Sequence, residues 1–483
     1  MVIALVATGR VETHSLLNAQ GWWGLSVTLL VFVSSAQHEY QKPAAHERRD
    51  FLLASLMAAL TVAACWRFFD VGFLSDDFIL VRRALKEQIW FAPLFTDGGG
   101  DGFYRPLGNL SFSLTAVWAG GDALLWHAGS LAIHAINTAL MFLLARKFGL
   151  PKASSAMAAA LFAIHGTRPE AVAWIAARFD LIMMFFVLCG LLLYQYERMW
   201  GPAFAFACMI CALLTKEAAY AFPLLLLLFG SARKTIPFFL GAGAMFIYRW
   251  TLLGGIGGYK SAGTNDPAVL NFGILPVLKV LALRLWSVLY FPINRAVEQS
   301  PLLAVLTAVY MAILICAAWN RMDRRQWTRA MLFLLAASIP PLHQLLIGLD
   351  LEKSRLLYLP AAGFCLMMGV LMDGQRGLLR WAFCAVLLLF HFGALQNNLN
   401  AWQSASDKAI ATLETASSCI GPNRDSADVR GLPRTYKGVY FFANGFAEGL
   451  ELLRGKPVSI NLGTAGAAVL TWDARRQELR CGE

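Results

Sequence analysis

Long apolar runs separated by short polar segments make up most of the chain. Most of the runs approach the length of about twenty residues that a helix needs to cross a bilayer. The main runs are Phe51–Phe69, Leu124–Ala145, Ala153–Ile164, Trp174–Tyr194, Pro202–Gly230, Ile236–Leu253, Pro301–Trp319, Ala330–Ile347, Leu357–Leu371 and Trp381–Leu395. Thr215-Lys216-Glu217 interrupts Pro202–Gly230, which therefore predicts two short helices with the charged pair on the outer side. The shorter run Gly21–Ser35 fits either a membrane helix or an interfacial helix. The pattern predicts an all-α polytopic membrane protein of the order of eleven or twelve transmembrane helices.

The polar segments between these runs are of two kinds, which alternate along the chain. One kind is rich in lysine and arginine, as at Arg146-Lys147, Arg233-Lys234 and Arg324-Arg325, and such clusters are typical of cytoplasmic loops. The other kind carries mixed charges and is therefore expected on the outer face. The first large outer loop is 70–123, and within it Phe78–Trp90 has the spacing of an amphipathic helix on the membrane surface.

The tail after the last apolar run has a different character. It contains a helix-like stretch, Ala447–Leu453, and three strand-like stretches, Lys437–Phe442, Val458–Leu462 and Ala467–Trp472. This mixture predicts a small α+β domain outside the membrane. The chain therefore divides into an N-terminal segment with one candidate membrane helix (1–50), a membrane domain (51–396) and a C-terminal domain (397–483).

Two of the nine cysteines, Cys419 and Cys481, lie in this polar tail, whereas the others lie in apolar segments. We hypothesise that the two form a disulfide. It would close a loop of about sixty residues and stabilise the domain by ~4 kcal/mol in the loop-entropy estimate.

Composition supports the membrane assignment. Hydrophobic residues make up 58% of the 483 residues, charged residues make up 15%, and the mean hydropathy is +0.56. A soluble globular chain carries about 25% charged residues. The net charge is +11, but the basic residues fall mostly in short clusters between the apolar runs, so the charge reflects membrane topology. We expect no nucleic-acid partner.

The candidate chemistry gathers on the face that the topology places outside. Each polar group has a simple structural reading, such as a solvated loop, a helix-hairpin turn or an interfacial anchor. Together they are harder to explain, because charged groups in lipid are costly unless they line a cavity or pair with one another. The group comprises Asp76, Asp77, Tyr104, Arg105, His165, Arg168, Glu170, Arg178, Asp180, Lys216, Glu217, Lys353 and Arg355.

An ordered set of short motifs resembles a known family. The motifs are Asp76-Asp77, Tyr104-Arg105-Pro106-Leu107, Trp126-His127, His134-Ala135-Ile136-Asn137, His165 with Pro169-Glu170, Arg178 with Asp180, Lys216-Glu217, and Arg355 through Pro360. In this order they resemble the GT-C membrane glycosyltransferases, in particular the protein O-mannosyltransferase-like branch that includes the tetratricopeptide-tailed transmembrane enzymes. The resemblance covers about Phe69 to Trp402. The family's usual His-Pro is here His165-Gly-Thr-Arg-Pro169, and the small C-terminal domain carries no tetratricopeptide pattern.

The resemblance implies transfer of a sugar, mannose-like or another, from a polyprenyl-phosphate donor to an acceptor hydroxyl. Inverting transfer needs a carboxylate base, which by resemblance is Asp76 or Asp77, with Asp76 favoured. The leaving phosphate needs cations or hydrogen-bond donors. Arg355 is the first choice for that role. The further candidates for binding the donor phosphate or sugar are Arg105, Tyr104, His165, Glu170, Arg178, Lys216, Glu217 and Tyr358.

No metal is expected to be required, although a divalent cation at the acidic pair stays open as an alternative. The acceptor also stays open between a protein hydroxyl, a lipid-linked saccharide and an envelope glycan. Two other classes compete: a polyprenyl-diphosphate-dependent O-antigen ligase or polymerase, and a lipid or sugar transporter. The end of the chain, Arg480-Cys481-Gly482-Glu483, carries no endoplasmic-reticulum retention signal. We therefore expect a bacterial inner membrane, with the active site and the tail on the periplasmic side.

Overall fold

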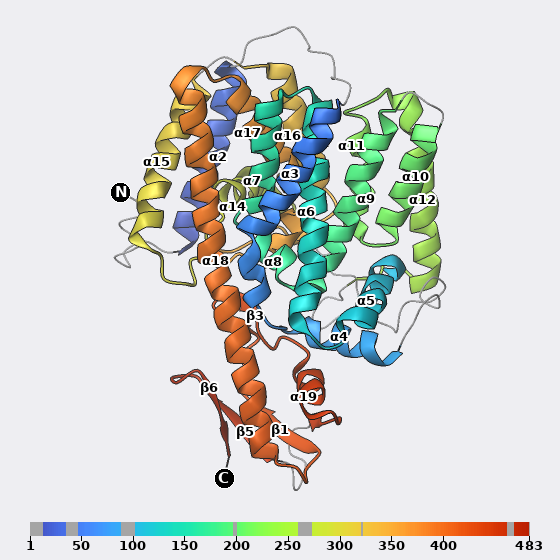
Figure 1. Cartoon of the computed structure of the whole chain (residues 1–483), viewed down its shortest axis with the longest axis vertical. Coiled ribbons are helices and arrows are strands. Elements are labelled where there is room, and N and C mark those ends of the chain that lie inside the picture. Colours follow the sequence, from blue (N-terminus) through green and yellow to red (C-terminus); the bar gives the residue numbers. More distant parts are fainter. Residues whose placement is uncertain are drawn as a thin grey trace.

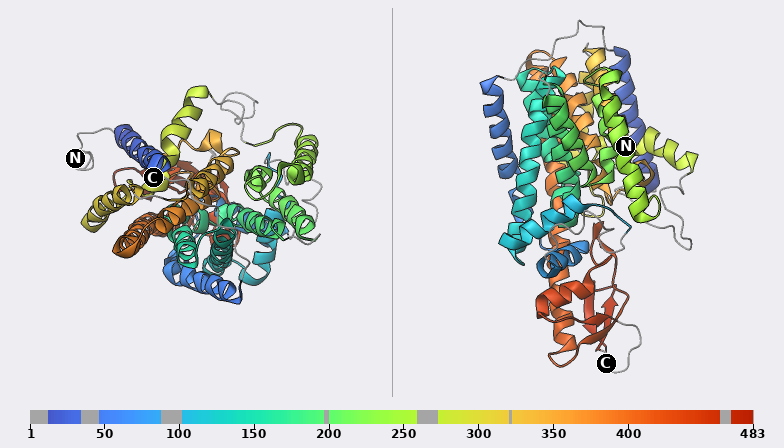
Figure 2. Two further views of the ribbon diagram at one scale, coloured as in Figure 1. Left: turned by 90° about the horizontal axis from the view of Figure 1, so that it is seen from above. Right: turned by 90° about the vertical axis from the view of Figure 1, so that its right-hand side faces the viewer.

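The computed structural model describes residues 13–34, 47–87, 102–196, 200–258, 273–319, 322–460 and 468–482. Most of these residues form a bundle of helices, and a smaller domain projects from one end of the bundle (Figure 1). The side view in Figure 2 shows the same separation. The end of the expected surface helix, 88–90, and the residues 461–462 and 467 of two expected strands lie outside the described residues.

The bundle contains long helices, short helices and several single turns. Its α-helices are α2 (Thr13–Ser34), α3 (Arg48–Ala64), α4 (Asp76–Glu87), α5 (Pro106–Ala119), α6 (Ala123–Phe148), α7 (Lys152–Ile164), α8 (Arg168–Val172), α9 (Arg178–Tyr194), α10 (Trp200–Leu213), α11 (Phe222–Leu226), α12 (Ala232–Leu253), α13 (Ile274–Lys279), α14 (Leu285–Tyr290), α15 (Pro301–Ala318), α16 (Arg324–Ser338), α17 (Pro360–Asp373) and α18 (Gly377–Ile420). The 3₁₀ turns are η1 (Trp66–Asp70), η3 (Ile175–Ala177), η4 (Glu217–Ala221), η7 (Leu342–Gln344) and η8 (Ser354–Leu357), and η6 (Val280–Arg284) is a π-helical turn.

Six helical segments of the described chain are long and apolar enough to cross a membrane: α2, α6, η3 with α9, α12, α15 and α18. Four shorter apolar helical segments, α7, α10, η4 with α11, and α17, lie among them. On α12 and α15 large apolar side chains face outward, for example Leu240 and Val305, as expected of helices in contact with lipid. These features confirm the expected all-α polytopic membrane protein. Six long segments in the described chain are fewer than the eleven or twelve membrane crossings expected from the sequence. That number is reached only if shorter helices also cross the membrane.

The core of the bundle lies where α6, α7, α9, α16 and α17 pack together. All residues of α17 from Pro360 to Met372 are buried. Gly363 lets α17 approach α16 closely, because a Cβ at this position would lie only 2.4 Å from the backbone nitrogen of Leu334. Small residues at helix crossings are typical of membrane bundles, where close van der Waals packing holds helices together.

The C-terminal domain is the predicted small α+β unit. Its four-stranded sheet has the order β4-β1-β5-β6, with β1 (Ser426–Arg430) parallel to β4 (Ser459–Ile460) and β5 (Ala468–Asp473), and β5 antiparallel to β6 (Glu478–Cys481). A hairpin of β2 (Thr435–Tyr436) and β3 (Val439–Tyr440) and the helix α19 (Phe446–Arg454) complete it. Strands β3, β4 and β5 and helix α19 overlap the expected stretches, whereas β1, β2 and β6 were not predicted.

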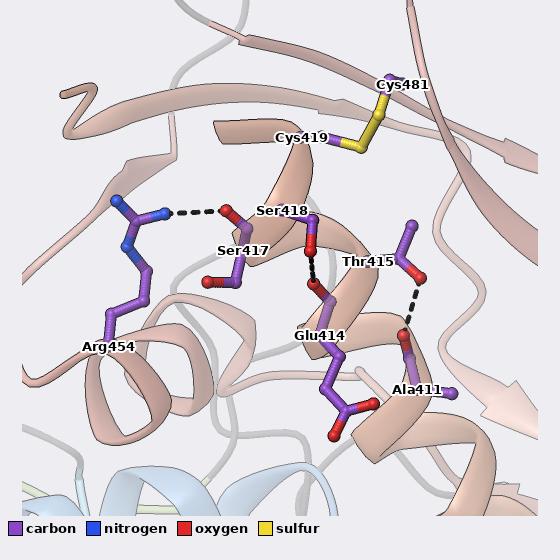
Figure 3. Close-up of a disulfide and its surroundings, with 8 residues drawn as sticks. All are labelled: Ala411, Glu414, Thr415, Ser417, Ser418, Cys419, Arg454 and Cys481. Carbon is purple, nitrogen blue, oxygen red and sulfur yellow. Dashed lines mark hydrogen bonds between the residues drawn. A yellow bond between two sulfur atoms is a disulfide. The ribbon is translucent and has the colours of Figure 1, made fainter. Parts of the chain in front are cut away.

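Helix α18 joins the two parts without a break. It begins in the bundle at Gly377 and continues to Ile420 in the C-terminal domain, as Figure 1 shows. The expected boundary at 396/397 therefore falls inside one helix. Near the end of this helix, Cys419 forms a disulfide with Cys481 of β6, with a Cα–Cα distance of 5.5 Å (Figure 3). Arg454 of α19 donates to the carbonyl of Ser417 at 3.2 Å in the same region.

Candidate active site

A cavity of about 710 Å³ lies at the end of the bundle that faces the C-terminal domain. Its walls come from α4, from the segment around Arg105, from the turns η3, η4, η7 and η8, from α12, and from one loop of the C-terminal domain. The charged, amide and imidazole side chains of its lining are Asp76, Arg83, Arg105, Asn109, Lys216, Glu217, Arg249, His343, Gln344, Arg355 and Asn444. Among the described lining residues there are thus five basic side chains, two carboxylates and one histidine.

The adjacent residues Asp76 and Asp77 have different environments. Asp77 is completely buried, and its two oxygens accept hydrogen bonds from the backbone nitrogens of Leu74 (3.1 Å) and Ala176 (2.7 Å). Burial raises the pKa of Asp77 well above its ordinary value, while the two backbone donors act in the opposite direction. Asp77 therefore joins the start of α4 to η3, whereas Asp76 is partly exposed and lines the cavity.

Arg355 lines the cavity from η8 and is held on two sides. Its guanidinium pairs with Glu170, which also accepts from the backbone nitrogen of Lys353 (3.1 Å) and from the hydroxyl of Ser354 (3.0 Å). The guanidinium carbon lies 4.7 Å from the ring centroid of Trp174. Burial alone would lower the pKa of Arg355, but the carboxylate of Glu170 raises it above its ordinary value. Glu170 thus fixes a permanent cation at the wall of the cavity.

Two cations share one carboxylate on another part of the wall. Glu217 accepts from Arg105 at 2.7 Å and from Arg249 at 2.9 Å. Burial acts to raise the pKa of Glu217, but the two guanidinium groups outweigh it and lower the pKa to about 2. Next to it, Lys216 pairs with Asp180 of α9. Burial lowers the pKa of Lys216, and the charge of Asp180 opposes that effect. This wall is therefore a preformed set of cations, each with a carboxylate partner.

The remaining sequence-predicted residues lie outside the lining. Tyr104 is buried against Tyr248, with a ring distance of 5.9 Å. Arg178 donates to Ser130, Thr115 and the carbonyl of Trp126, and so binds α9 to α5 and α6. His165 contacts Thr167 and the carbonyl of Leu289, and the Tyr358 hydroxyl lies 2.7 Å from His134. In the structure these side chains hold helices together around the cavity. Glu170 also lies outside the lining, and it acts by holding Arg355 at the cavity wall.

The cavity also contains residues that the sequence analysis did not single out: Arg83, Asn109, Arg249, His343, Gln344 and Asn444. Arg249 could have been found, because an arginine inside the apolar run Ile236–Leu253 indicates a function or a buried partner. Asn444 carries no comparable signal, since asparagine is common in polar loops. No group of three or more His, Cys, Asp or Glu side chains suited to a metal occurs among the described residues.

The fold and the cavity together define the class: an integral membrane protein with a charged cavity at one end of its helix bundle, beside a small α+β domain. Comparison with known proteins then makes the relationship specific. The chain is 37% identical over 144 residues to the protein O-mannosyl-transferase Tmtc1 of Drosophila melanogaster. It is 26% identical over 165 residues to the protein O-mannosyl-transferase TMTC3 of Mus musculus. A protein O-mannosyl-transferase of Caenorhabditis elegans is 23% identical over 294 residues.

These matches confirm the resemblance to protein O-mannosyl-transferases. They cover 29%, 32% and 56% of this chain, and 16%, 18% and 42% of the three relatives, respectively. The chain therefore spans less than half the length of these relatives. No family model matches the chain, and no solved structure matches it.

Proposed function

We propose that this protein is an integral-membrane glycosyltransferase of the GT-C type. It transfers a sugar from a polyprenyl-phosphate donor to an acceptor hydroxyl, with Asp76 as the general base. The observation that carries the proposal is the composition of the cavity, in which a partly exposed carboxylate faces the same space as five basic side chains. The similarity to protein O-mannosyl-transferases supports mannose as the sugar and a protein hydroxyl as the acceptor.

The base acts on the acceptor. As the acceptor oxygen attacks the anomeric carbon, its proton moves to the carboxylate of Asp76. The bond between the anomeric carbon and the phosphate oxygen breaks, and its electron pair leaves with the phosphate. General bases of this kind contribute about 10²–10⁴-fold to a rate. Asp77 is a poor candidate for the same role, because both of its oxygens already accept backbone hydrogen bonds.

The cationic wall suits the leaving phosphate. Negative charge develops on the phosphate in the transition state, and fixed cations in a partly buried site stabilise it without reorganisation. Arg355, Lys216, Arg105 and Arg249 are held in place by Glu170, Asp180 and Glu217. Arg355 is our first choice for the phosphate, since a guanidinium matches the geometry of phosphate oxygens.

The lipid part of the donor needs an apolar path into the cavity. Part of the lining is apolar and comes from neighbouring segments, namely Leu224 of α11, Phe246 of α12, and Ile339, Pro340 and Pro341 after α16. Ile339 and Phe246 are also among the exposed large apolar residues. A polyprenyl chain that lies in the bilayer can therefore reach the cavity along this side.

The position of the cavity supports an active site on the outer face. Helices α16 and α18 begin at basic clusters, which include Arg324, Arg325, Arg376 and Arg380, and both run toward the end with the cavity (Figure 1). Basic clusters at the opposite end match the cytoplasmic side. A periplasmic site in a bacterial inner membrane stays our prediction for the location, although the relatives named above are from animals.

The test is an in vitro transfer assay with the full-length protein in nanodiscs. It offers radiolabelled polyprenyl-phosphate mannose, other polyprenyl-phosphate sugars and polyprenyl-diphosphate glycans, with a membrane extract as the source of acceptor. We expect transfer from a monophosphate donor and a loss of about 10²-fold or more in Asp76→Asn. The exposed carboxylate of Asp407 on α18 provides the matched control, Asp407→Asn, which should keep full activity.

Three results would contradict the proposal. Full activity of folded Asp76→Asn protein would remove the base assignment. Unchanged donor affinity and turnover in Arg355→Ala would remove the phosphate role of Arg355. Transfer only from diphosphate-linked glycans would favour a ligase instead. Protease sensitivity of the labelled product identifies a protein acceptor, and extraction into organic solvent identifies a lipid-linked one.

A further inference from the structure

Helix α4, which begins at Asp76, presents different faces to different parts of the molecule. Asp76, Ile79, Leu80 and Arg83 line the cavity. Val81 and Ala84 are buried against the membrane domain, in a cluster with Phe112 and Trp126. A third row, Phe78, Arg82 and Lys86, repeats every four residues, so its members share one face of the helix. This third face meets the C-terminal domain.

The contacts of that face are both apolar and ionic. The ring of Phe78 stacks on Phe442 with a centroid distance of 6.1 Å. Gly449 of α19 lies against the same ring, because a Cβ there would be 3.3 Å from it. Glu451 of α19 pairs with both Arg82 and Lys86. The helix that carries Asp76 is therefore docked on the C-terminal domain along its length.

A loop of the same domain fastens the start of α4. The backbone nitrogen of Ser75 donates to the carbonyl of Phe441 at 3.0 Å, and the backbone nitrogen of Asn444 donates to the hydroxyl of Ser75 at 3.3 Å. Gly445 has a positive φ of 82°, and a Cβ there would lie 2.2 Å from the carbonyl oxygen of Ser75. Only glycine permits both this backbone conformation and this approach.

The loop places the side chain of Asn444 on Asp76. Nδ2 of Asn444 donates a hydrogen bond of 2.8 Å to Oδ1 of Asp76. Both side chains line the cavity. An amide hydrogen bond to one carboxylate oxygen fixes the rotation of the carboxyl group. The other oxygen, Oδ2, is then left to face the hydroxyl group that receives the sugar. An asparagine amide is neutral, so it gives this orientation without the ion pair that a lysine or arginine would form with the base.

We propose that Asn444 is a positioning residue for Asp76, and that the C-terminal domain is thereby part of the catalytic site. This inference rests on the proposed role of Asp76 as the base. Asn444 orients the carboxylate of Asp76 by binding Oδ1. The proton of the sugar-accepting hydroxyl then goes to Oδ2. The C-terminal domain therefore acts on the transfer step itself.

The test uses the full-length protein in the transfer assay with polyprenyl-phosphate mannose and membrane extract. Asn444→Ala removes the amide that donates a hydrogen bond to Asp76. We expect the maximal rate to fall about 10- to 100-fold, while the KM for the polyprenyl-phosphate mannose stays unchanged. Asn444→Asp keeps the shape but places a second carboxylate against Asp76, so its loss should be at least as large. Asn423→Ala, at an exposed asparagine of the same domain, is the matched control. Thermal unfolding should be the same in all of these variants.

A double variant separates this inference from the proposed function. If Asn444 acts through Asp76, Asp76→Asn with Asn444→Ala should be no slower than Asp76→Asn alone, because the two effects are not additive. A near-inactive Asp76→Asn together with full rates in both Asn444 variants would overturn the positioning role alone. A multiplicative loss in the double variant, or a rise in donor KM with an unchanged maximal rate, would also overturn it. Full activity of Asp76→Asn, or no transfer by the unmutated protein, would overturn both ideas.

Discussion

The cavity has two kinds of wall, and they are stabilised differently. On the membrane-domain wall each cation has a carboxylate partner, as in Arg355 with Glu170 and Lys216 with Asp180. On the wall formed by α4 and the C-terminal domain, Asp76 accepts one hydrogen bond from the exposed Asn444. A buried ion pair is costly to break, because the remaining charge stays in a low-dielectric site. A single hydrogen bond from a neutral amide at an exposed position contributes much less.

This difference indicates how the two walls respond to mutation. Changes in the cationic wall should lower the stability of the fold together with activity. Changes around Asp76 should lower activity with little effect on stability. The following four predictions test this contrast, from the largest expected effect on stability to the smallest.

The largest effect is expected at Glu170. Glu170→Ala leaves Arg355, whose side chain is only 14% exposed, without its carboxylate partner. We expect a loss of about 3–5 kcal/mol in the free energy of unfolding, together with loss of transfer. Thermal unfolding in detergent measures the loss of stability. The exposed Glu414 on α18 serves as the control, since Glu414→Ala should unfold like the unmutated protein. An unchanged unfolding temperature for Glu170→Ala would show that the ion pair does not stabilise this wall.

The disulfide should be next in size. Cys419→Ser with Cys481→Ser removes a link that closes 62 residues, and we expect a loss of about 2–4 kcal/mol, confined to the C-terminal domain. Limited proteolysis of the tail measures this loss of stability. The transfer rate reports on it as well, because the same domain carries Asn444. Cys316→Ser, at an exposed free cysteine of α15, is the control. Equal protease resistance of the double variant and the control would contradict this prediction.

A smaller, pH-dependent effect is expected at Glu217. Its folded-state pKa of about 2 lies below the ordinary value of 4.5. The carboxylate therefore stabilises the protein above about pH 4.5, and this contribution is lost as the pH falls toward 2. Glu217→Gln should be less stable by about 1–2 kcal/mol at pH 7, and the difference should shrink in acid. A difference in unfolding temperature that stays constant from pH 7 to about pH 3 would contradict the pairing with Arg105 and Arg249.

The smallest effect is expected at Glu451. Glu451→Gln weakens the contacts of α19 with Arg82 and Lys86, which are both partly exposed, so we expect a loss of less than about 1 kcal/mol. Transfer should fall by less than in Asn444→Ala, because Glu451 holds α4 but does not touch Asp76. A loss of activity as large as that of Asn444→Ala, at unchanged stability, would show that docking of α4 matters more than the hydrogen bond to Asp76.

Several residues that the sequence singled out lie together in the structure. Asp76, Arg105, Lys216, Glu217 and Arg355 were expected on one face and do line one cavity. The positive-inside pattern could indicate this, because it assigns loops to a face of the membrane. It could not separate residues that line the cavity from those behind it. The backbone hydrogen bonds of Asp77 and the contacts of Arg178 with α5 and α6 depend on packing between segments far apart in the chain.

By itself the sequence determined the class of the protein. Apolar runs of membrane-spanning length, basic loops and a polar tail are local properties, and each follows from the cost of placing polar groups in lipid. Only the tertiary structure decided how the tail is used. It brings Asn444 to Asp76 across 368 positions of the chain and directs Asp77 away from the cavity. Such contacts depend on how whole elements dock, and no local pattern of residues encodes that.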